Sequence, residues 1–285
     1  MLPVFIDGMH GMGDNIYQRG FVKKFPGAYI KTPWPEIYEG LDVKFVRSNT
    51  TLRTQQKNES VSGIQWHDVP ANARRIKVGY GVAHMRAGSV LDAMANQFGV
   101  SSDPLDLPEF KINSLFPPKL AIVRPVTERS EWLNQSRNPD PQYIYQAAAE
   151  LKRRGYYVVS IADLDDGKEW LCGDAPPADI QLHKGELKIK ELLSLVQHAK
   201  VIVGGVGWIL PAAVAYNVPL ALVLGGNGGC NHPTKVTSSI IMNLGKLGCI
   251  YPDDYCMCEE MKHSCNKKIS NFDSQFKAFL DERIL

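Results

Sequence analysis

The sequence predicts an α/β protein made of two doubly wound parallel-sheet domains that face a central cleft. Short apolar runs alternate with amphipathic stretches over most of the 285 residues, as in successive βαβ units. This alternation is interrupted by a proline-rich stretch at 101–118 and then begins again. Hydrophobic residues make up 44% and charged residues 22%, the balance of a globular protein. Ligands of such sheets bind beyond the carboxyl ends of the strands, where we expect the cleft.

The first domain is expected to cover residues 1–112. Residues 48–72 are polar and poorly periodic, so we expect a loop or a short excursion there. Apolar runs predict strands at Val4–Asp7, Ala28–Lys31, Val43–Val46 and Arg75–Tyr80, and amphipathic stretches predict helices at Asn15–Phe25, Pro35–Glu39 and Ser89–Phe98.

The second domain is expected at 119–269, after a linker at 113–118. The tail 270–285 carries Phe272, Phe276, Phe279 and Leu280 on one helical face, which predicts a helix packing back toward the first domain. Strands are expected at Lys119–Val123, Tyr157–Ile161, Ile180–Leu182, Val201–Val203 and Leu220–Leu224, with helices at Pro141–Arg154, Leu187–His198 and Ile209–Tyr216.

A glycine-rich turn follows the first strand, with glycines at 8, 11 and 13 and the carboxylate of Asp14 at the start of the next helix. Glycines let a ligand approach the backbone, and the helix start offers unpaired N–H groups. Asp14 has two interpretations: it is a helix N-cap, or a general base that deprotonates a hydroxyl. His10 could share the second role or hydrogen-bond a substrate.

Two further glycine loops, Gly204–Trp208 and Gly225–Gly229, follow neighbouring strands and suit a bound phosphate or diphosphate. Arg124, Thr127 and Arg129 follow another strand of the same domain and supply cationic and hydroxyl donors. The alternatives are tight turns that need glycine for packing, and solvated arginines. The residues expected to bind the phosphate-bearing ligand are Arg124, Thr127, Arg129, Gly205, Val206, Gly207, Trp208, Gly226 and Asn227.

Four cysteines, Cys249, Cys256, Cys258 and Cys265, lie close together near the C-terminus, with His263 among them. They provide enough soft ligands for a tetrahedral structural site holding zinc or iron. The alternative is a set of reduced, partly buried thiols.

Several of these segments together resemble one family. Gly13-Asp14-Asn15 opens a helix, and Glu191-Leu192 with Val196, Ala199 and Ile202 precedes a glycine loop. Gly204 to Pro219 is rich in alanine, and Cys256-x-Cys258 precedes His263-x-Cys265. The pattern is similar to that of the heptosyltransferase-like (family nine) glycosyltransferases, and it is distributed over most of the chain.

The resemblance implies a GT-B fold with two Rossmann-like domains, the second holding a nucleotide-sugar donor linked to ADP, UDP or GDP. It implies that Asp14 is the catalytic base and that catalysis requires no metal. The implied donor-binding residues include Gly13 and Lys184 beside those given above, with Lys184 near the nucleoside.

The chain departs from the family at the phosphate-binding turn. Many members carry Asp-Thr-Gly followed by a histidine, whereas this chain has Gly205-Val206-Gly207, with Leu210 in the place of the histidine. A different donor, a diphosphate held by backbone, or lost activity would each accommodate this. A nucleotide-sugar epimerase and a non-catalytic nucleotide- or glycan-binding protein are therefore kept as alternatives.

The acceptor is left open among glycolipid, protein, small molecule and modified nucleic acid. His84 and Arg86 are the candidate acceptor-side residues for an anionic acceptor. Asp163-Leu164-Asp165 could hold a divalent ion, although so short a motif arises easily by chance. No signal peptide and no apolar run of ~20 residues is present, so we expect a cytoplasmic protein.

Overall fold

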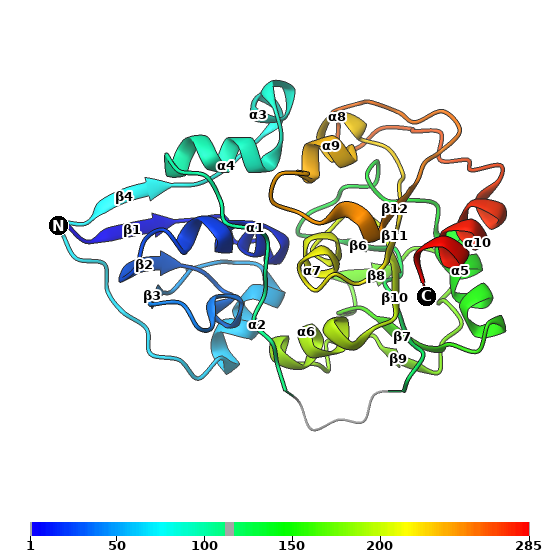
Figure 1. Ribbon diagram of the computed structural model, residues 1–285, viewed down its shortest axis with the longest axis horizontal. Coiled ribbons are helices and arrows are strands. Elements are labelled where there is room, and N and C mark those ends of the chain that lie inside the picture. The colour runs from blue at the N-terminus through cyan, green and yellow to red at the C-terminus, as the bar shows by residue number, and fades with distance from the viewer. Residues whose placement is uncertain (1, 112–116, 285) are drawn as a thin grey trace. The chain divides into compact units, whose positions relative to one another are not determined.

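The computed structural model describes residues 2–111 and 117–284 and divides into two compact units (Figure 1). The first unit comprises 1–109 together with 234–242, and the second comprises 110–233 and 243–285. The boundary thus lies close to the expected one, but a short segment from the second half of the sequence belongs to the first unit. Most of the expected linker at 113–118 lies outside the described residues.

The first unit is built on a four-stranded parallel sheet of order β3-β2-β1-β4. Residues at the sheet centre, such as Ile6 and Ile30, are fully buried. The expected strands are confirmed, except that the last one ends at Lys77 rather than Tyr80. The strands are β1 (Val4–Asp7), β2 (Ala28–Lys31), β3 (Val43–Val46) and β4 (Arg74–Lys77). The helices are α1 (Met12–Val22), η1 (Pro35–Tyr38), α2 (Arg53–Val61), α3 (Val82–Ala87), α4 (Val90–Phe98) and, partly, α9 (Pro233–Val236).

Of two helices in the first unit, α2 was not expected from the sequence and α4 was. The expected loop at 48–72 contains α2, which the apolar pattern misses because its buried residues are the polar Gln55 and Asn58. Helix α4 is confirmed with its end signals, since Ser89 accepts a hydrogen bond from the Asp92 N–H and Gly99 adopts a φ of 69° after the last turn.

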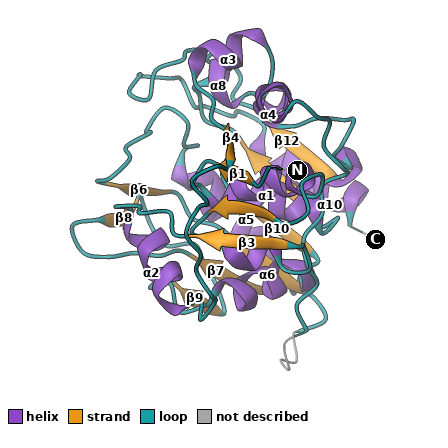
Figure 2. Cartoon of the chain, turned by 90° about the vertical axis from the view of Figure 1, so that its left-hand side faces the viewer, coloured by secondary structure: helices purple, strands orange, loops and turns teal. Residues whose placement is uncertain are grey.

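The second unit contains a six-stranded parallel sheet of order β12-β11-β10-β5-β7-β9. It also contains a separate antiparallel sheet of two strands, β6 and β8, which are neighbours in Figure 2. The strands are β5 (Leu120–Val123), β6 (Thr127–Arg129), β7 (Tyr157–Ile161), β8 (Glu169–Leu171), β9 (Ile180–Leu182), β10 (Val201–Gly204), β11 (Leu220–Val223) and β12 (Leu247–Ile250). The helices are α5 (Pro141–Arg153), α6 (Ile189–His198), α7 (Ile209–Ala215), α8 (Gly228–Asn231), η2 (Leu244–Lys246) and α10 (Phe272–Arg283).

The five expected strands of this unit are confirmed, and β6, β8 and β12 are additional. Strands β5, β10 and β11 are buried along their whole length. Because both faces of such strands are covered, their sequences are continuous apolar runs, which predict strands clearly. Strand β12, Leu-Gly-Cys-Ile, is mostly half-buried and lacks such a run.

The C-terminal helix α10 packs within the second unit, beside α5 (Figure 1). Phe272 and Phe276 enter the core that Tyr143 and Ile144 of α5 help to form, and Arg154 pairs with Asp281 at 2.5 Å. The expectation that the tail packs toward the first domain is wrong. The amphipathic pattern identified the apolar face correctly but carried no information about its partner.

In the part of the chain that the structure describes, no helix is both long and apolar enough to cross a membrane.

Candidate active site

The carboxylate of Asp14 lies in the first turn of α1, at the carboxyl end of β1. Helix α1 begins at Met12, three residues earlier than expected, and its N-cap residue is Gly11. Asp14 is therefore not the N-cap, which removes the simpler of the two interpretations. An anionic side chain in a first helical turn is stabilised by the helix dipole.

Two close neighbours fix the direction of the Asp14 carboxylate. The hydroxyl of Tyr80 donates a hydrogen bond to Oδ1 at 2.5 Å. On the other side, a Cβ added to Gly11 would lie 2.3 Å from Oδ2. Glycine at position 11 thus leaves room for the carboxylate in this orientation, and it is not needed for a positive φ, since its φ is −63°.

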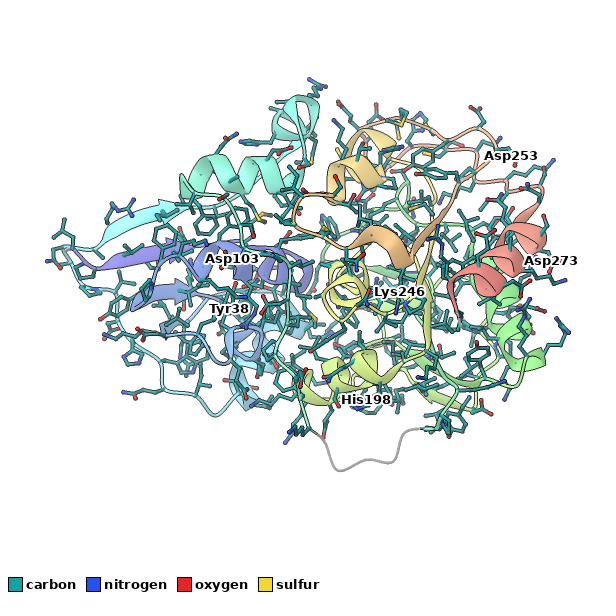
Figure 3. The ribbon with its side chains drawn as sticks, viewed as in Figure 1. Tyr38, Asp103, His198, Lys246, Asp253 and Asp273 are labelled. Atoms are coloured by element: carbon teal, nitrogen blue, oxygen red, sulfur yellow. The ribbon has the colours of Figure 1, made fainter. Side chains whose placement is uncertain are left out.

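The turn before Asp14 is held by two buried amide side chains. Asn15 Nδ2 donates to the carbonyls of Met9 at 2.9 Å and Gly11 at 2.8 Å. Gln18 accepts from the Met9 N–H and donates to the Met9 carbonyl, both at 3.2 Å. The hydroxyl of Tyr38, labelled in Figure 3, donates to Asn15 Oδ1 at 2.9 Å. The conformation of the turn is thereby fixed by these hydrogen bonds.

His10 lies in the same turn and is half-buried. Burial, and secondarily the charge of Lys31, hold the pKa of His10 below its usual value, so the ring is neutral at neutral pH. Asp7 and Glu59 act in the opposite direction. A neutral imidazole suits hydrogen bonding to a hydroxyl, while its sharing of the base role with Asp14 stays a prediction.

The second unit contains a pocket that gathers three arginines, which we call the arginine pocket. It brings together five of the residues expected to bind phosphate and adds others that were not expected from the sequence. The expected residues are Arg124, Thr127, Arg129, Gly205 and Val206, and the additional ones include Trp132, Asn134, Arg137 and Asn138. The guanidinium of Arg137 lies over the Trp132 ring at 4.6 Å. These four residues lie in an irregular loop, where no periodicity could have identified them.

Arg124 is a half-buried cation of the arginine pocket. Burial, and next the charge of Arg129, lower its pKa to about 10, while Glu169 acts in the opposite direction. The group therefore remains charged at neutral pH. Glu169 is itself engaged by the hydroxyl of Thr127, which donates to it at 2.9 Å, and by Arg129 at 3.9 Å. Clustered, partly desolvated guanidinium groups are well suited to bind a phosphate or diphosphate.

The remaining residues of the first glycine loop lie next to this pocket. Gly207 packs against the Arg124 guanidinium, because a Cβ there would lie 2.8 Å from Nη1. Trp208 is the N-cap residue of α7.

The second glycine loop, Gly225–Gly229, packs against the cysteine-containing segment. The N–H groups of Gly228 and Gly229 donate to the carbonyls of Cys256 and Cys258 at 2.9 and 3.0 Å. A Cβ on Gly226 would lie 2.4 Å from the sulfur of Cys265. Close packing thus explains these glycines without a ligand, and a donor-binding role for Gly226 and Asn227 stays a prediction.

The cysteine segment forms a cluster of four metal-ligating side chains, which we call the Cys₃His cluster. The ligand atoms of Cys256, Cys258, His263 and Cys265 all lie within 4.8 Å of one another. Three thiols and an imidazole form a ligand set typical of tetrahedral zinc. Cys249, expected among the ligands, lies instead on β12, where burial raises its pKa to about 11. His263 takes its place.

Lys184 lies beside the Asp-x-Asp segment rather than in the arginine pocket. It forms an isolated β-bridge with Asp163, and its N–H donates to Glu186 at 2.9 Å. Asp165 pairs with Lys168 at 3.2 Å.

The expected acceptor-side residues lie on α3, which follows β4. His84 shares a pocket with Lys77, Tyr80 and Gln97, which we call the β4–α3 pocket. Arg86 is exposed on the same helix. Tyr80 therefore belongs both to this pocket and to the surroundings of Asp14.

No protein-family model matches the chain, and no curated protein matches its sequence. Solved structures, however, match nearly its whole length. The iron-containing dodecameric glycosyltransferase TibC from enterotoxigenic E. coli H10407 gives a TM-score of 0.62 at 15% identity, covering 99% of this chain and 76% of TibC. E. coli ADP-heptose lps heptosyltransferase II gives 0.51 at 13% identity, covering 98% and 99%. E. coli heptosyltransferase WaaC with ADP-2-deoxy-2-fluoro heptose gives 0.52 at 10% identity, covering 99% of each chain.

The chain therefore has the α/β fold of the heptosyltransferases and related glycosyltransferases. The resemblance found in the sequence is confirmed at the level of the fold.

Proposed function

We propose that this protein is a glycosyltransferase of GT-B type that moves a sugar from a nucleotide-sugar donor to an acceptor hydroxyl. The second unit would bind the donor and the first unit the acceptor. The observation that carries this proposal is the arginine pocket, which half-buried Arg124 lines together with Arg129, Arg137 and the turn at Gly205. A concentration of cations at the end of β5 and β10 provides a site for a diphosphate in a fold shared with nucleotide-sugar enzymes.

The donor class favoured is an ADP-linked sugar. WaaC has been solved with ADP and with ADP-2-deoxy-2-fluoro heptose, and TibC with ADP-D-beta-D-heptose. In this chain Arg124 and Arg129, with the backbone of Gly205 and Val206, would hold the diphosphate. Guanidinium groups and backbone N–H groups can stabilise the departing diphosphate in place of a divalent ion. Lys184 would lie near the nucleoside.

Asp14 would act as the general base. As the acceptor oxygen attacks the anomeric carbon, its proton passes to the Asp14 carboxylate and the bond between that carbon and the diphosphate breaks. The diphosphate leaves with the bonding electron pair, and the arginine pocket compensates its charge. His10 would hydrogen-bond the acceptor, which would approach from the side of His84 and Arg86.

We further propose that the Cys₃His cluster holds a structural zinc or iron ion. The donor set fits such an ion, and TibC is iron-containing. The ion would cross-link the cysteine segment and would supply no chemistry to sugar transfer. Metal analysis of the purified protein tests this: about one ion per chain, lost in Cys258→Ser and kept in Cys172→Ser, is the expected result.

A nucleotide-sugar screen by thermal shift tests the donor assignment. ADP-heptose should raise the melting temperature of the wild-type protein at millimolar concentration and leave that of Arg124→Ala unchanged. UDP- and GDP-sugars in the same screen test the other donor classes. No stabilisation by any nucleotide sugar or nucleoside diphosphate would contradict the proposal. An epimerase is distinguished by its turnover without acceptor, since a transferase releases nucleotide in proportion to acceptor added.

A further inference from the structure

Asp14 and Tyr80 are brought together by two neighbouring strands of the first sheet. Strands β1 and β4 pair in parallel, with Asp7 opposite Lys77 at their carboxyl ends. The Val78 N–H donates to the Asp7 carbonyl at 3.0 Å and extends this pairing. The chain beyond β1 then leads to Asp14, and the chain beyond β4 leads to Tyr80. Both side chains therefore belong to the same sheet edge, where α/β proteins place their functional groups.

The backbone on both sides of Tyr80 is fixed by side chains of the following helices. The Gly79 N–H donates to Gln97 Oε1 at 2.8 Å, and Gln97 Nε2 donates back to the Gly79 carbonyl at 2.5 Å. The Gly81 N–H donates to His84 Nδ1 at 3.2 Å. These hydrogen bonds hold the backbone on both sides of Tyr80 in one conformation. The Tyr80 side chain therefore loses little conformational freedom when its hydroxyl binds Asp14 Oδ1.

Two other phenols, those of Tyr17 and Tyr38, interact electrostatically with Asp14, but their hydroxyls are engaged elsewhere. Tyr17 donates to the Val236 carbonyl at 2.6 Å, and Tyr38 donates to Asn15 Oδ1 at 2.9 Å. Burial raises the pKa of both, so they stay neutral and do not titrate with the carboxylate. Tyr80 faces Asp14 with a donated hydrogen bond.

Lys77 and His84 are the charged or titratable side chains that line the β4–α3 pocket together with Tyr80.

We propose that Tyr80 is a positioning residue for the catalytic base. Its hydroxyl donates to Oδ1 of Asp14, favours the ionised carboxylate and fixes the direction in which the carboxylate faces. The proposal deepens the function proposed above and rests on Asp14 being the base. Tyr80 comes from a different strand than the one before the glycine turn and lies 66 residues from Asp14 in sequence.

The hydrogen bond can be tested without knowing the acceptor. A water-soluble carbodiimide with glycine methyl ester modifies carboxyl groups in their protonated form, and mass spectrometry of the full-length protein reports modification at Asp14 as a function of pH. In Tyr80→Phe we expect the half-maximal pH of modification to rise by roughly one unit, because the ionised carboxylate has lost a donor. Tyr29→Phe, which removes a phenol hydroxyl from β2, should leave the profile unchanged. A superimposable profile in Tyr80→Phe would overturn the proposal.

A second variant and a second readout separate this proposal from the proposed function. Gln97→Ala removes the two hydrogen bonds to Gly79 but keeps the phenol of Tyr80. This variant should also raise the half-maximal pH of modification at Asp14. With a donor that supports turnover, Tyr80→Phe should lower kcat by roughly tenfold and leave the KM for the donor unchanged. Normal turnover in Asp14→Asn would defeat the proposed base, whereas the modification profile would still decide whether Tyr80 acts on Asp14.

Discussion

The guanidinium of Arg124 lies directly against Gly207, in the space that a side chain at position 207 would occupy. A Cβ at Gly207 would stand 2.8 Å from Nη1 of Arg124. The sequence departs from the glycosyltransferase pattern that it resembles at Gly205 and Val206, whereas Gly207 matches that pattern, and Gly207 leaves room for the half-buried guanidinium of Arg124. The third position of the turn is therefore compatible with a phosphate site.

Gly207→Ala should weaken nucleotide binding without unfolding the protein. The added methyl group would push the Arg124 guanidinium out of the arginine pocket, and losing a charge-assisted contact costs about 1.5–3 kcal/mol, or about 10- to 100-fold in the Kd for ADP. Titration calorimetry with ADP measures this. Arg153→Ala, which removes an arginine exposed on α5, is the control and should bind normally. Equal affinity in Gly207→Ala would show that Arg124 does not contact the nucleotide.

Asp14→Asn should separate catalysis from donor binding. General-base catalysis contributes about 10²- to 10⁴-fold, so kcat should fall by that factor. The affinity for nucleotide sugar should be unchanged, because Asp14 belongs to the first unit and the arginine pocket to the second. Rates of nucleotide release together with calorimetry test both parts. A kcat within twofold of wild type would remove Asp14 from the mechanism.

Gly11→Ala should also impair proton transfer to Asp14, because it changes the residue that packs against Oδ2 of the carboxylate. An alanine Cβ would lie 2.3 Å from Oδ2 of Asp14, so the side chain must rotate away from its bond with Tyr80. We expect a loss of kcat of at least tenfold, with the nucleotide affinity of the wild type. Gly27→Ala is unsuitable as a control because Gly27 has a φ of 74°, so the melting temperature of Gly11→Ala itself reports whether the turn tolerates the added methyl group. Unchanged kcat in Gly11→Ala would mean that the carboxylate orientation is unimportant.

The sequence predicted what depends on local pattern. Buried strands such as β5 and β10 are continuous apolar runs, and Gly99 ends α4 with a left-handed residue, so both were identified correctly. Helix α2 was not predicted because its buried side chains are polar amides and give no apolar pattern. Helix α10 was found, but a pattern along one segment cannot name the surface that the segment packs against.

The candidate site shows the same division. Arg124 and Gly205 could be grouped from the sequence, since both follow strands of one sheet and parallel strands end at a common edge. The Tyr80 hydrogen bond depended on the pairing of β1 with β4, and Arg137 lies in an irregular loop. The loop Gly225–Gly229 looked like a phosphate site because glycine serves close packing and ligand approach equally well.

If the Cys₃His cluster holds the proposed ion, removing that ion should weaken nucleotide binding. The segment that carries the Cys₃His cluster is also hydrogen-bonded to the loop beside the arginine pocket. The Ser136 N–H of that loop donates to the Met261 carbonyl at 3.2 Å, and Lys267 donates to the Gln135 carbonyl at 2.8 Å. Asn134 and Arg137 of that loop line the pocket. Without a metal cross-link the segment should loosen, and the loop with it.

The test compares Cys258→Ser with Cys172→Ser, which changes a cysteine outside the cluster. The first should lose its metal, melt at a lower temperature and bind ADP at least threefold more weakly, while the second should match the wild type in all three. Loss of metal with wild-type affinity for ADP would show that the cluster stabilises only its own segment.

Glu150 should make the second unit sensitive to acid. Hydrogen bonds from Arg153, and further from Arg154, lower the pKa of this carboxyl from 4.5 to about 2, against the opposing effect of burial. A lowered folded-state pKa contributes stability that is complete above the unfolded value and is lost as pH falls from about 4.5 toward 2.

Glu150→Gln should therefore be less stable than the wild type at pH 7. The difference should be roughly 1 kcal/mol, because both arginines reach solvent and the solvent screens their charges. Urea unfolding at pH 7 and pH 3 measures this, and the gap between the two proteins should narrow at pH 3. A gap independent of pH would mean that Glu150 stabilises α5 by packing rather than by its charge.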